Sequence, residues 1–363
     1  MIFQKLHALL QLQSSLEHAR TFLHHESVKH ALMMLTEGTS MRLSFTAGPR
    51  AKWFDAWGPE LDEALAELPE LEMCPHDVFR EMARTPSRAM KRLALIHREG
   101  EPIAVACVRR RLTFWEPLLE EAVPFDVIPA KSGELGNALR ALGLEVSVSG
   151  YPEEPSALAP TAVTPYAFYR ANLRENFEEH WRKEDRLYTI RKARKRTAGL
   201  KVRWDHPADV DWIVKTWTEM WSDDPAQQTL AAADRLVASR MLLQRGQLHS
   251  VALLDGDEPV AGATHVVRGK ALLFHCNARD RSRGPQAVGT RVLDETFQWA
   301  AANGFESFDL GGGMDYKRWW APTAGERYHL RFCPPLVTAA RRLAARFGPA
   351  DVPALPAPAR AAE

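Results

Sequence analysis

Residues Ser250 to Trp320 read SVALLDGDEPVAGATHVVRGKALLFHCNARDRSRGPQAVGTRVLDETFQWAAANGFESFDLGGGMDYKRWW. Runs of apolar residues on both sides of an Asp-Gly-Asp turn at 255–257 predict a hairpin. The elements expected along the stretch are strands at 250–254, 259–267 and 271–277, a basic loop at 279–286, an amphipathic helix at 288–302 and a strand at 305–310. A basic, glycine-containing loop that opens a helix offers unpaired backbone N–H groups and the positive end of the helix dipole. The stretch therefore predicts a seat for a pyrophosphate group.

Three segments of the chain resemble signatures of one superfamily. Gln286-Ala-Val-Gly289-Thr-Arg291 resembles the Q/R-x-x-G-x-G/A pyrophosphate loop of the GNAT acyltransferases, with Arg291 in place of the last small residue. Asp309-Leu-Gly-Gly-Gly-Met-Asp-Tyr316-Lys317 resembles the D-x-G-x-G…Y-K signature of a CelD-like acetyltransferase branch, which is related to the FemAB peptidoglycan aminoacyltransferases. The basic segment at 188–202 is similar to that branch's R-R-x-x-R-x-x-x-x-x-G-x-V segment, and the matches follow the family order over roughly residues 166–321.

This resemblance implies an acyl-CoA co-substrate, most simply acetyl-CoA, and no metal. The residues that it assigns to cofactor binding are Arg281, Arg283, Gly284, Gln286, Gly289, Thr290 and Arg291. The superfamily also implies that backbone N–H groups around 275–277 stabilise the thioester oxygen, where two adjacent strands splay apart.

Acyl transfer to an amine also requires proton transfers. Tyr316 is the expected acid for the departing thiolate, or else an aromatic anchor for the glycine run. Lys317 either neutralises charge on the acceptor or transition state or is a surface lysine. Asp309 either orients or deprotonates the amine, or accepts hydrogen bonds from the glycine amides. His275 and His265 are candidate bases on predicted strands, with core packing as the alternative.

An internal repeat organises the rest of the chain. Residues 93–106 and 251–263 carry nearly the same strand–turn–strand phrase, LALIHREGEPIAVA and VALLDGDEPVAGA. Counting 30 residues from the proline in each phrase reaches the head of a predicted helix, at Ser132 and at Gly289. The expected fold class is α/β (α+β mixed sheet), with two tandem GNAT-like units whose helices pack on mixed, largely antiparallel sheets.

The repeat leads to five expected regions. They are an N-terminal helical segment at 1–40, a first structural or acceptor-groove unit at 41–150, a linker at 151–165, a second unit with the acyl-CoA site at 166–335, and a C-terminal helix with a disordered Pro/Ala-rich tail at 336–363. The histidines of the first region lack carboxylates or cysteines at ligand spacing, so a solvated helical face is favoured over a metal site.

Composition places limits on the function. The chain has 363 residues, and its 47 Lys and Arg nearly cancel 46 Asp and Glu, so binding of polyanions can only be local. A local run does exist at 191–196, where five of six residues are basic. It contacts the cofactor's phosphates, a lipid-linked diphosphate acceptor or tRNA, or else it is a solvated helix paired with Glu178, Glu179, Glu184 and Asp185. Four separated cysteines and the lack of a long apolar run indicate a cytoplasmic protein without a transmembrane segment.

The sequence therefore predicts an N-acyltransferase that moves an acyl group, expected to be acetyl, from acyl-CoA to an amine. The acceptor is a small-molecule or lipid-linked amine, such as an amino sugar or an envelope or polysaccharide intermediate, by analogy with the family. One alternative is a FemAB-like aminoacyltransferase that uses aminoacyl-tRNA. The other is a non-catalytic binding module with a decayed acyl site. The sequence does not fix the oligomeric state.

Overall fold

The computed structural model describes residues 48–72, 74–86, 90–111, 114–117, 128–151, 154–221, 225–282, 287–312 and 314–334. The expected N-terminal helical segment at 1–40, with its histidines, and the expected C-terminal helix and tail at 336–363 lie outside the described residues.

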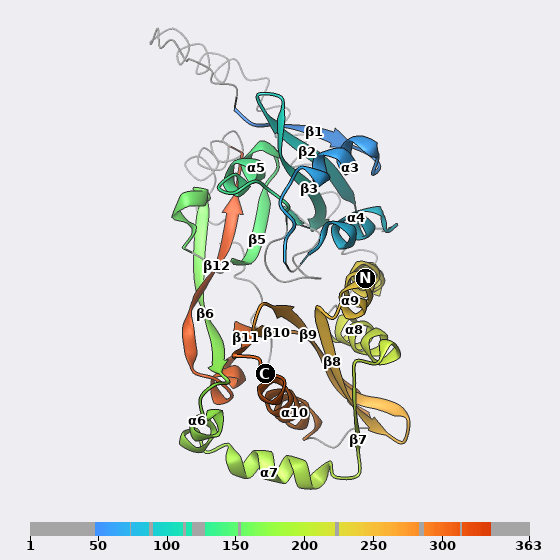
Figure 1. Cartoon of the computed structure of the whole chain (residues 1–363), viewed down its shortest axis with the longest axis vertical. Helices are drawn as coiled ribbons and strands as arrows, with labels where there is room; N and C mark the ends of the chain where they lie inside the picture. The colour runs from blue at the N-terminus through green and yellow to red at the C-terminus, as the bar shows by residue number, and fades with distance from the viewer. Residues whose placement is uncertain are drawn as a thin grey trace, which may run out of the picture. The chain divides into compact units, whose positions relative to one another are not determined.

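The described elements fall into two consecutive sets (Figure 1). The first set consists of β1 (Arg50–Phe54), α3 (Pro59–Ala66), α4 (His76–Arg84), β2 (Lys91–Arg98), β3 (Glu101–Arg111), β4 (Phe114–Pro117), α5 (Leu135–Ala141), β5 (Val146–Tyr151) and β6 (Ala162–Asn172). Two helices follow, α6 (Phe177–Lys183) and α7 (Leu187–Arg196). The second set consists of β7 (Lys201–Trp204), α8 (Pro207–Trp221), α9 (Pro225–Gln244), β8 (Leu248–Asp255), β9 (Glu258–Arg268), β10 (Ala271–Arg279), α10 (Val288–Ala302), β11 (Ser307–Gly312) and β12 (Thr323–Phe332).

The two sets repeat one order of elements: a strand, two helices, three strands, one helix and two strands. Their pairings repeat as well, because β1–β4 and β7–β10 are antiparallel ladders, whereas β4 with β5 and β10 with β11 are parallel pairs. The tandem arrangement and the mixed α/β class predicted from the sequence are therefore confirmed. The predicted helix at 288–302 coincides with α10. The boundaries of the five predicted regions stay predictions; β6 begins at Ala162, inside the segment expected to be a linker.

All twelve described strands form one sheet, in the order β1-β2-β3-β4-β5-β12-β6-β11-β10-β9-β8-β7. The last strand of each set has exchanged places with the other. Strand β12, from the second set, pairs with β5 of the first, and β6, from the first set, pairs with β11 of the second. Because β6 and β12 also pair with each other, the centre of the sheet is built from both halves of the chain.

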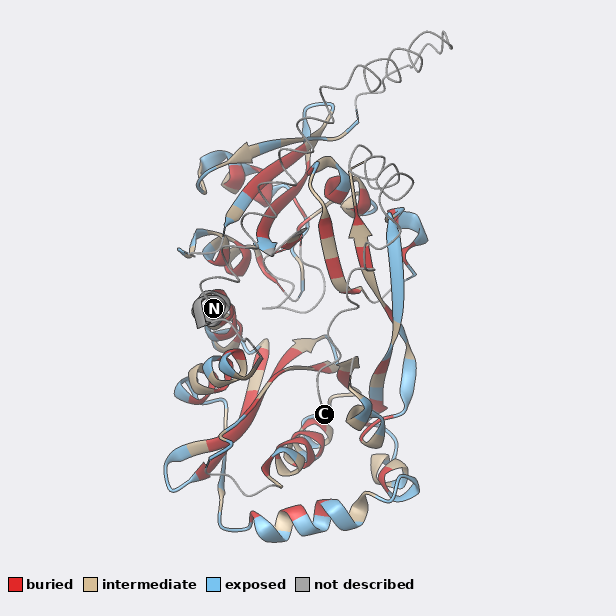
Figure 2. Cartoon of the chain, turned by 180° about the vertical axis from the view of Figure 1, so that it is seen from behind, coloured by how far each residue is buried: buried red, intermediate tan, exposed pale blue. Residues whose placement is uncertain are grey.

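Alternate residues of the second set face opposite layers, as the two-residue period of a strand requires. Val251 and Ala263 pack with Val292 of α10. Gly262, the neighbour of Ala263 on β9, faces the other layer and has no room for a Cβ, because the side chain of Ile213 on α8 would lie 2.7 Å away. Figure 2 shows the buried residues running along the strands and helix α7 largely exposed.

Among the described helices, none is both long and apolar enough to cross a membrane.

Candidate functional site

The head of α10 lies at the carboxyl end of β10. Asp280 begins the connecting loop, where its Oδ1 accepts a hydrogen bond of 2.8 Å from the backbone N of Ser282. Helix α10 begins at Val288 after Ala287, which provides no side-chain cap, and its first turn holds no acidic residue. The first N–H groups of a helix have no partner within the helix, so this end presents positive partial charge to the loop side.

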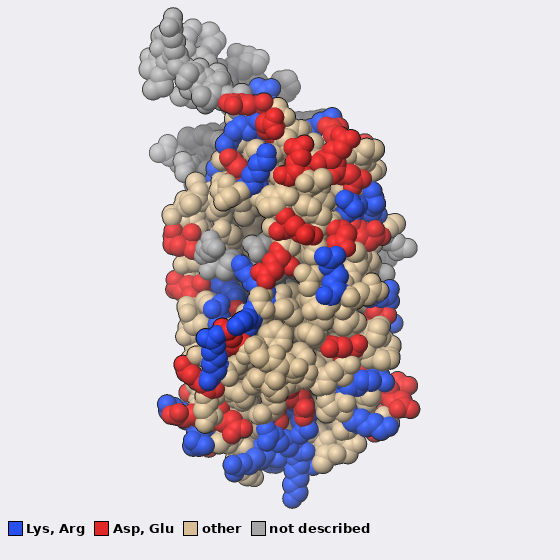
Figure 3. Space-filling view, in the orientation of Figure 1, with Lys and Arg blue, Asp and Glu red and all other residues tan. Residues whose placement is uncertain are grey.

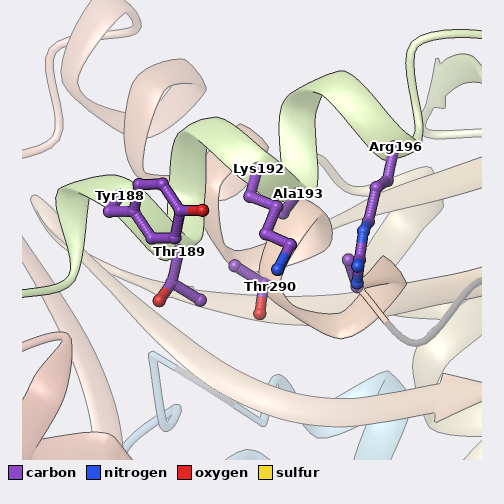
Figure 4. Close-up of a pocket in the computed structure, with 7 residues that line it drawn as sticks. Tyr188, Thr189, Lys192, Ala193, Arg196 and Thr290 are labelled. Carbon is purple, nitrogen blue, oxygen red and sulfur yellow. The ribbon is translucent and has the colours of Figure 1, made fainter.

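A pocket of about 270 Å³ opens between this helix head and α7. Its lining residues are Tyr188, Thr189, Lys192, Ala193 and Arg196 from α7, with Ala287 and Thr290 from the start of α10. Figure 4 shows Lys192 and Arg196 extending from α7 on the side where Thr290 lies. The pocket therefore combines a helix head with two basic side chains from a neighbouring helix.

A bidentate ion pair connects α7 to α10. Arg194 donates from Nε and Nη2 to the two carboxylate oxygens of Asp294, at 2.7 and 2.6 Å, and Asp294 is only 2% exposed. The hydrogen bond to Asp294 raises the pKa of Arg194. Ile190 and Ala193 are buried on the same helix. Because Arg194 makes a bidentate contact with a buried carboxylate, it is the structural member of the basic run.

The other basic residues of this run are exposed. Arg191, Lys192, Lys195 and Arg196 all lie at the protein surface, and only Lys192 and Arg196 line the pocket. Figure 3 shows Lys and Arg side chains gathered over α7. Glu179 was one of the acids expected to pair with this basic run. Its carboxylate instead lies 3.0 Å from Nζ of Lys183 on α6.

Strands β10 and β11 separate at their carboxyl ends. Their parallel pairing covers Ala271 to Leu273 against Ser307 to Asp309, although β10 continues to Arg279 and β11 to Gly312. Each strand also shifts register against its outer neighbour here, between Phe274 and Cys276 on β10 and between Asp309 and Gly311 on β11. A bulge of this kind bends a strand and re-aims its groups. His275 lies at the β10 bulge, in the segment at 275–277 whose backbone N–H groups the family resemblance assigns to the oxyanion.

Asp309 lies at the edge of this opening and is 3% exposed. Its Oδ1 accepts a hydrogen bond of 2.8 Å from the backbone N of Gly311, and its Oδ2 accepts one from Nη2 of Arg327. Nη2 of Arg170 lies 3.5 Å from the same Oδ2. Arg170 and Arg327 also lie over the ring of Phe168, at 5.1 and 4.5 Å. The carboxylate thus both holds the glycine turn and neutralises part of an arginine pair.

Lys317 and Tyr316 follow in a 3-10 turn at Asp315–Trp319. Nζ of Lys317 donates to the carbonyl oxygen of Gly312 at 2.8 Å. Burial lowers the pKa of Lys317 to about 8, against the opposing effect of the Asp309 charge. Burial raises the pKa of the Tyr316 hydroxyl to about 12, so this hydroxyl is protonated at neutral pH. Both residues are partly buried beside the opening.

The glycines of this turn are required by geometry. Gly311 has a φ of +70°, a conformation that L side chains rarely adopt. A Cβ on Gly312 would lie 2.2 Å from the ring of Tyr166. Tyr166 stacks in turn on His329 of β12, with ring centroids 4.4 Å apart. Gly313, the third glycine of the run, lies outside the described residues.

The two candidate histidines have different surroundings. His265 is fully buried among Phe274 and Phe308, and burial lowers its pKa to about 3. His265 is therefore a neutral core residue, the packing alternative. His275 is partly buried, and its Nδ1 lies 3.3 Å from Oγ1 of Thr264.

The residues expected to bind the cofactor are only partly assembled. Thr290 lines the pocket, and among the described residues no atom lies within 4 Å of the position that a Cβ on Gly289 would take. Arg291 forms an ion pair with Glu295 one turn along α10, and Arg281 is exposed. Arg283, Gly284 and Gln286 lie outside the described residues. Within the described ranges no group of three metal-ligating side chains occurs.

Sequence reasoning missed Arg170 and Arg327. They reach Asp309 from β6 and β12, strands whose pairing joins segments more than 150 residues apart. Neither residue belongs to a local pattern, and only the exchange of β6 and β12 between the two sets brings them to β11. The sequence also does not indicate that Lys192 and Arg196 line the pocket whereas Arg194 binds Asp294.

Comparison with known families and structures gives one family-model match and several similar solved structures. Residues 184–318 match the family model described as an acetyltransferase (GNAT) domain. A search of curated proteins found no match. Among solved structures, L-PGS from Bacillus licheniformis is 11% identical with a TM-score of 0.48, over 78% of this chain and 95% of that chain. A tandem GNAT protein from the clavulanic acid biosynthesis pathway is 10% identical with a TM-score of 0.43, over 78% and 98%. FemX is 11% identical with a TM-score of 0.41, over 79% and 99%.

Proposed function

Residues 184–318 belong to the GNAT acetyltransferase family, so this chain carries an acyltransferase domain, and on that premise we propose that it transfers an acyl group from acyl-CoA to an amine. The acyl group is acetyl in its simplest form, as in the CelD-like branch that the signatures resemble. The pocket between α7 and the head of α10 carries the proposal, because it joins helix N–H groups to two basic side chains.

The diphosphate of CoA would bind at the start of α10. Gly289 and Thr290 lie in its first turn, whose N–H groups point along the helix axis toward the loop, and a Cβ on Gly289 would meet no described atom within 4 Å. A diphosphate gains from both the unpaired N–H groups and the helix dipole. Arg291, already paired with Glu295, would contribute through its backbone rather than its guanidinium.

The thioester would extend from this seat into the opening between β10 and β11. Its carbonyl oxygen gains negative charge as the amine attacks, and β10 near His275 continues beyond the point where its pairing with β11 ends. The N–H of Cys276 donates to Oγ1 of Thr264, so the donors would come from the neighbouring backbone positions of β10. Such preorganised donors stabilise the charge that develops in the transition state.

Three side chains would handle protons and charge. The amine nitrogen forms the new bond to the carbonyl carbon, loses a proton to His275, and the C–S bond breaks. The departing thiolate takes a proton from Tyr316, whose raised pKa keeps its hydroxyl protonated until then. Lys317, held by the Gly312 carbonyl, would stabilise negative charge in its protonated form. Asp309 would position Arg327 and the glycine turn, since its oxygens already accept hydrogen bonds from both.

The acceptor would bind beside the central strands. Around Asp309 lie three cationic side chains, Arg170, Arg327 and Lys317, and the Arg170 side chain is 46% exposed. An excess of positive charge suits an amine that also carries a carboxylate or phosphate group, as many amino-sugar and envelope intermediates do. None of the four cysteines, all of which lie in the described residues, forms a disulfide bond, and the proposal places the protein in the cytoplasm.

Binding and turnover with acetyl-CoA test this function. We expect acetyl-CoA to raise the melting temperature of the full chain, and free CoA to accumulate when an amino-sugar library is added. If charged tRNA copurifies with the protein instead and acetyl-CoA has no effect, the aminoacyl-tRNA alternative replaces the proposal. If neither ligand binds, the decayed-module alternative stands.

A further inference from the structure

Helix α7 lies outside the repeated set of elements, yet it forms most of the pocket wall. Five of the seven lining residues come from it. The ion pair between Arg194 and Asp294 holds the helix in this place. Under the proposed function the head of α10 binds the diphosphate. The side chains of α7 therefore remain to contact another part of the same ligand.

Three residues spaced by four positions form a stripe on α7. Tyr188, Lys192 and Arg196 share one helical face and all line the pocket. Tyr188 is 70% exposed, an unusual state for a large aromatic side chain, and Nζ of Lys192 lies 5.9 Å from its ring centroid. The sequence of α7, LYTIRKARKR, contains no acidic residue to offset its cations.

This stripe suits one class of ligand. Like charges four residues apart repel one another, and a bound anion between Lys192 and Arg196 would relieve that repulsion. An exposed aromatic face next to paired cations is the combination that binds a base and a phosphate together. A phosphate alone would not use the ring, and an apolar ligand would not use the cations.

We propose that α7 is the subsite for the adenosine 3′-phosphate of CoA, with Tyr188 stacked on the adenine and Lys192 and Arg196 paired with the 3′-phosphate. The inference rests on the proposed function. It adds that the protein discriminates between acyl donors by the presence of the adenosine 3′-phosphate. Acyl groups carried on a protein-bound phosphopantetheine lack the adenosine 3′-phosphate, so the stripe would favour free acyl-CoA over acyl-carrier proteins.

The test compares CoA with dephospho-CoA, which lacks only the 3′-phosphate, by titration calorimetry on the full chain. The wild type should bind CoA at least about tenfold more tightly, the scale of charge-assisted hydrogen bonds. The variant Lys192→Ala/Arg196→Ala should lose this preference and bind both ligands as the wild type binds dephospho-CoA. Tyr188→Ala should weaken both ligands by a similar factor and leave the binding of 4′-phosphopantetheine unchanged.

The matched control is Arg191→Ala/Lys195→Ala, which removes two exposed cations of α7 that do not line the pocket. It should keep the preference for CoA. If the wild type binds CoA and dephospho-CoA equally, or if the control loses the preference as fully as the pocket variant, the subsite is wrong while the proposed function stands. If the wild type binds neither, both fail. Competition by uncharged tRNA at concentrations that displace CoA would assign the stripe to RNA and overturn the inference.

Discussion

Lys317 donates a 2.8 Å hydrogen bond from its Nζ to the carbonyl oxygen of Gly312, and burial lowers its pKa from 10.5 to about 8. A buried ammonium group that is protonated at neutral pH costs folding free energy. The unfolded chain binds this proton up to pH 10.5 and the folded chain releases it near pH 8, so stability rises with pH between these values. The gain is at most about 3 kcal/mol.

We therefore expect Lys317→Met to be at least as stable as the wild type at pH 7 but strongly impaired in acyl transfer, by about 100-fold or more in kcat. Because the protonated form is proposed to act, wild-type activity should fall as the pH rises through about 8. Chemical denaturation and pH–rate profiles measure both effects. Lys183→Met, at a 71% exposed lysine paired with Glu179, is the matched control and should change neither. Full activity in Lys317→Met would remove Lys317 from the mechanism.

Tyr316→Phe tests the proposed acid for the thiolate. The ring packs against the apolar cluster around Phe297 and Trp320, so the variant should keep its stability within about 0.5 kcal/mol. Loss of the hydroxyl should lower kcat by about 100-fold with little change in KM. Donors with a more acidic thiol leaving group should be less affected, because their thiolates need no proton. An equal loss for all leaving groups would argue that the hydroxyl only supports the turn.

Arg194→Met tests the attachment of α7. The change leaves the carboxylate of Asp294, which is 2% exposed, without its bidentate partner. We expect a loss of about 1–3 kcal/mol in unfolding free energy, less than for a fully buried pair because the Arg194 side chain is 41% exposed, and faster amide hydrogen exchange in α7. The double variant Arg194→Met/Asp294→Leu should recover most of the stability, since it removes both charges. If exchange in α7 is unchanged in Arg194→Met, the ion pair does not hold the helix.

Gly289→Ala separates the needs of the fold from those of the ligand. A Cβ there meets no atom of the described residues within 4 Å, and alanine favours helices, so the free protein should gain up to about 1 kcal/mol in unfolding free energy. The gain should come with weaker CoA binding, because the added methyl group lies where the diphosphate approaches. Gly136→Ala, in α5, is the contrasting variant: its Cβ would lie 2.5 Å from the Leu158 carbonyl oxygen and should destabilise. A Gly289→Ala variant that binds CoA normally would move the diphosphate elsewhere.

Local patterns were enough to locate most elements of the second set. The strand–turn–strand phrase and the helix at 288–302 depend on neighbouring residues, so periodicity and turn chemistry found them. The repeat of that phrase also predicted the tandem order of elements. The exchange of β6 and β12 left no local signal, because it depends on which strand edges meet after the helices have packed.

The candidate site divides in the same way. Asp309 and Lys317 were found from a signature, whereas Arg170 and Arg327 reach Asp309 across strand pairings that no short motif encodes. From the sequence, Asp309 could act on the acceptor amine or accept hydrogen bonds from the glycine amides. The structure shows that its carboxylate accepts a hydrogen bond from the backbone N of Gly311. The basic run on α7 was visible as charge, but only its packing separates Arg194 from Lys192 and Arg196.

Calorimetric titration of the full chain with acetyl-CoA, alongside the variant Gly289→Trp, tests most directly whether the head of α10 binds the donor. We expect saturable one-to-one binding to the wild type and none to the variant, whose indole would occupy the space beside Gly289, with unchanged unfolding of the variant as the control. Equal binding by the two proteins, or no binding by the wild type at millimolar ligand, would show that the donor does not bind at the head of α10.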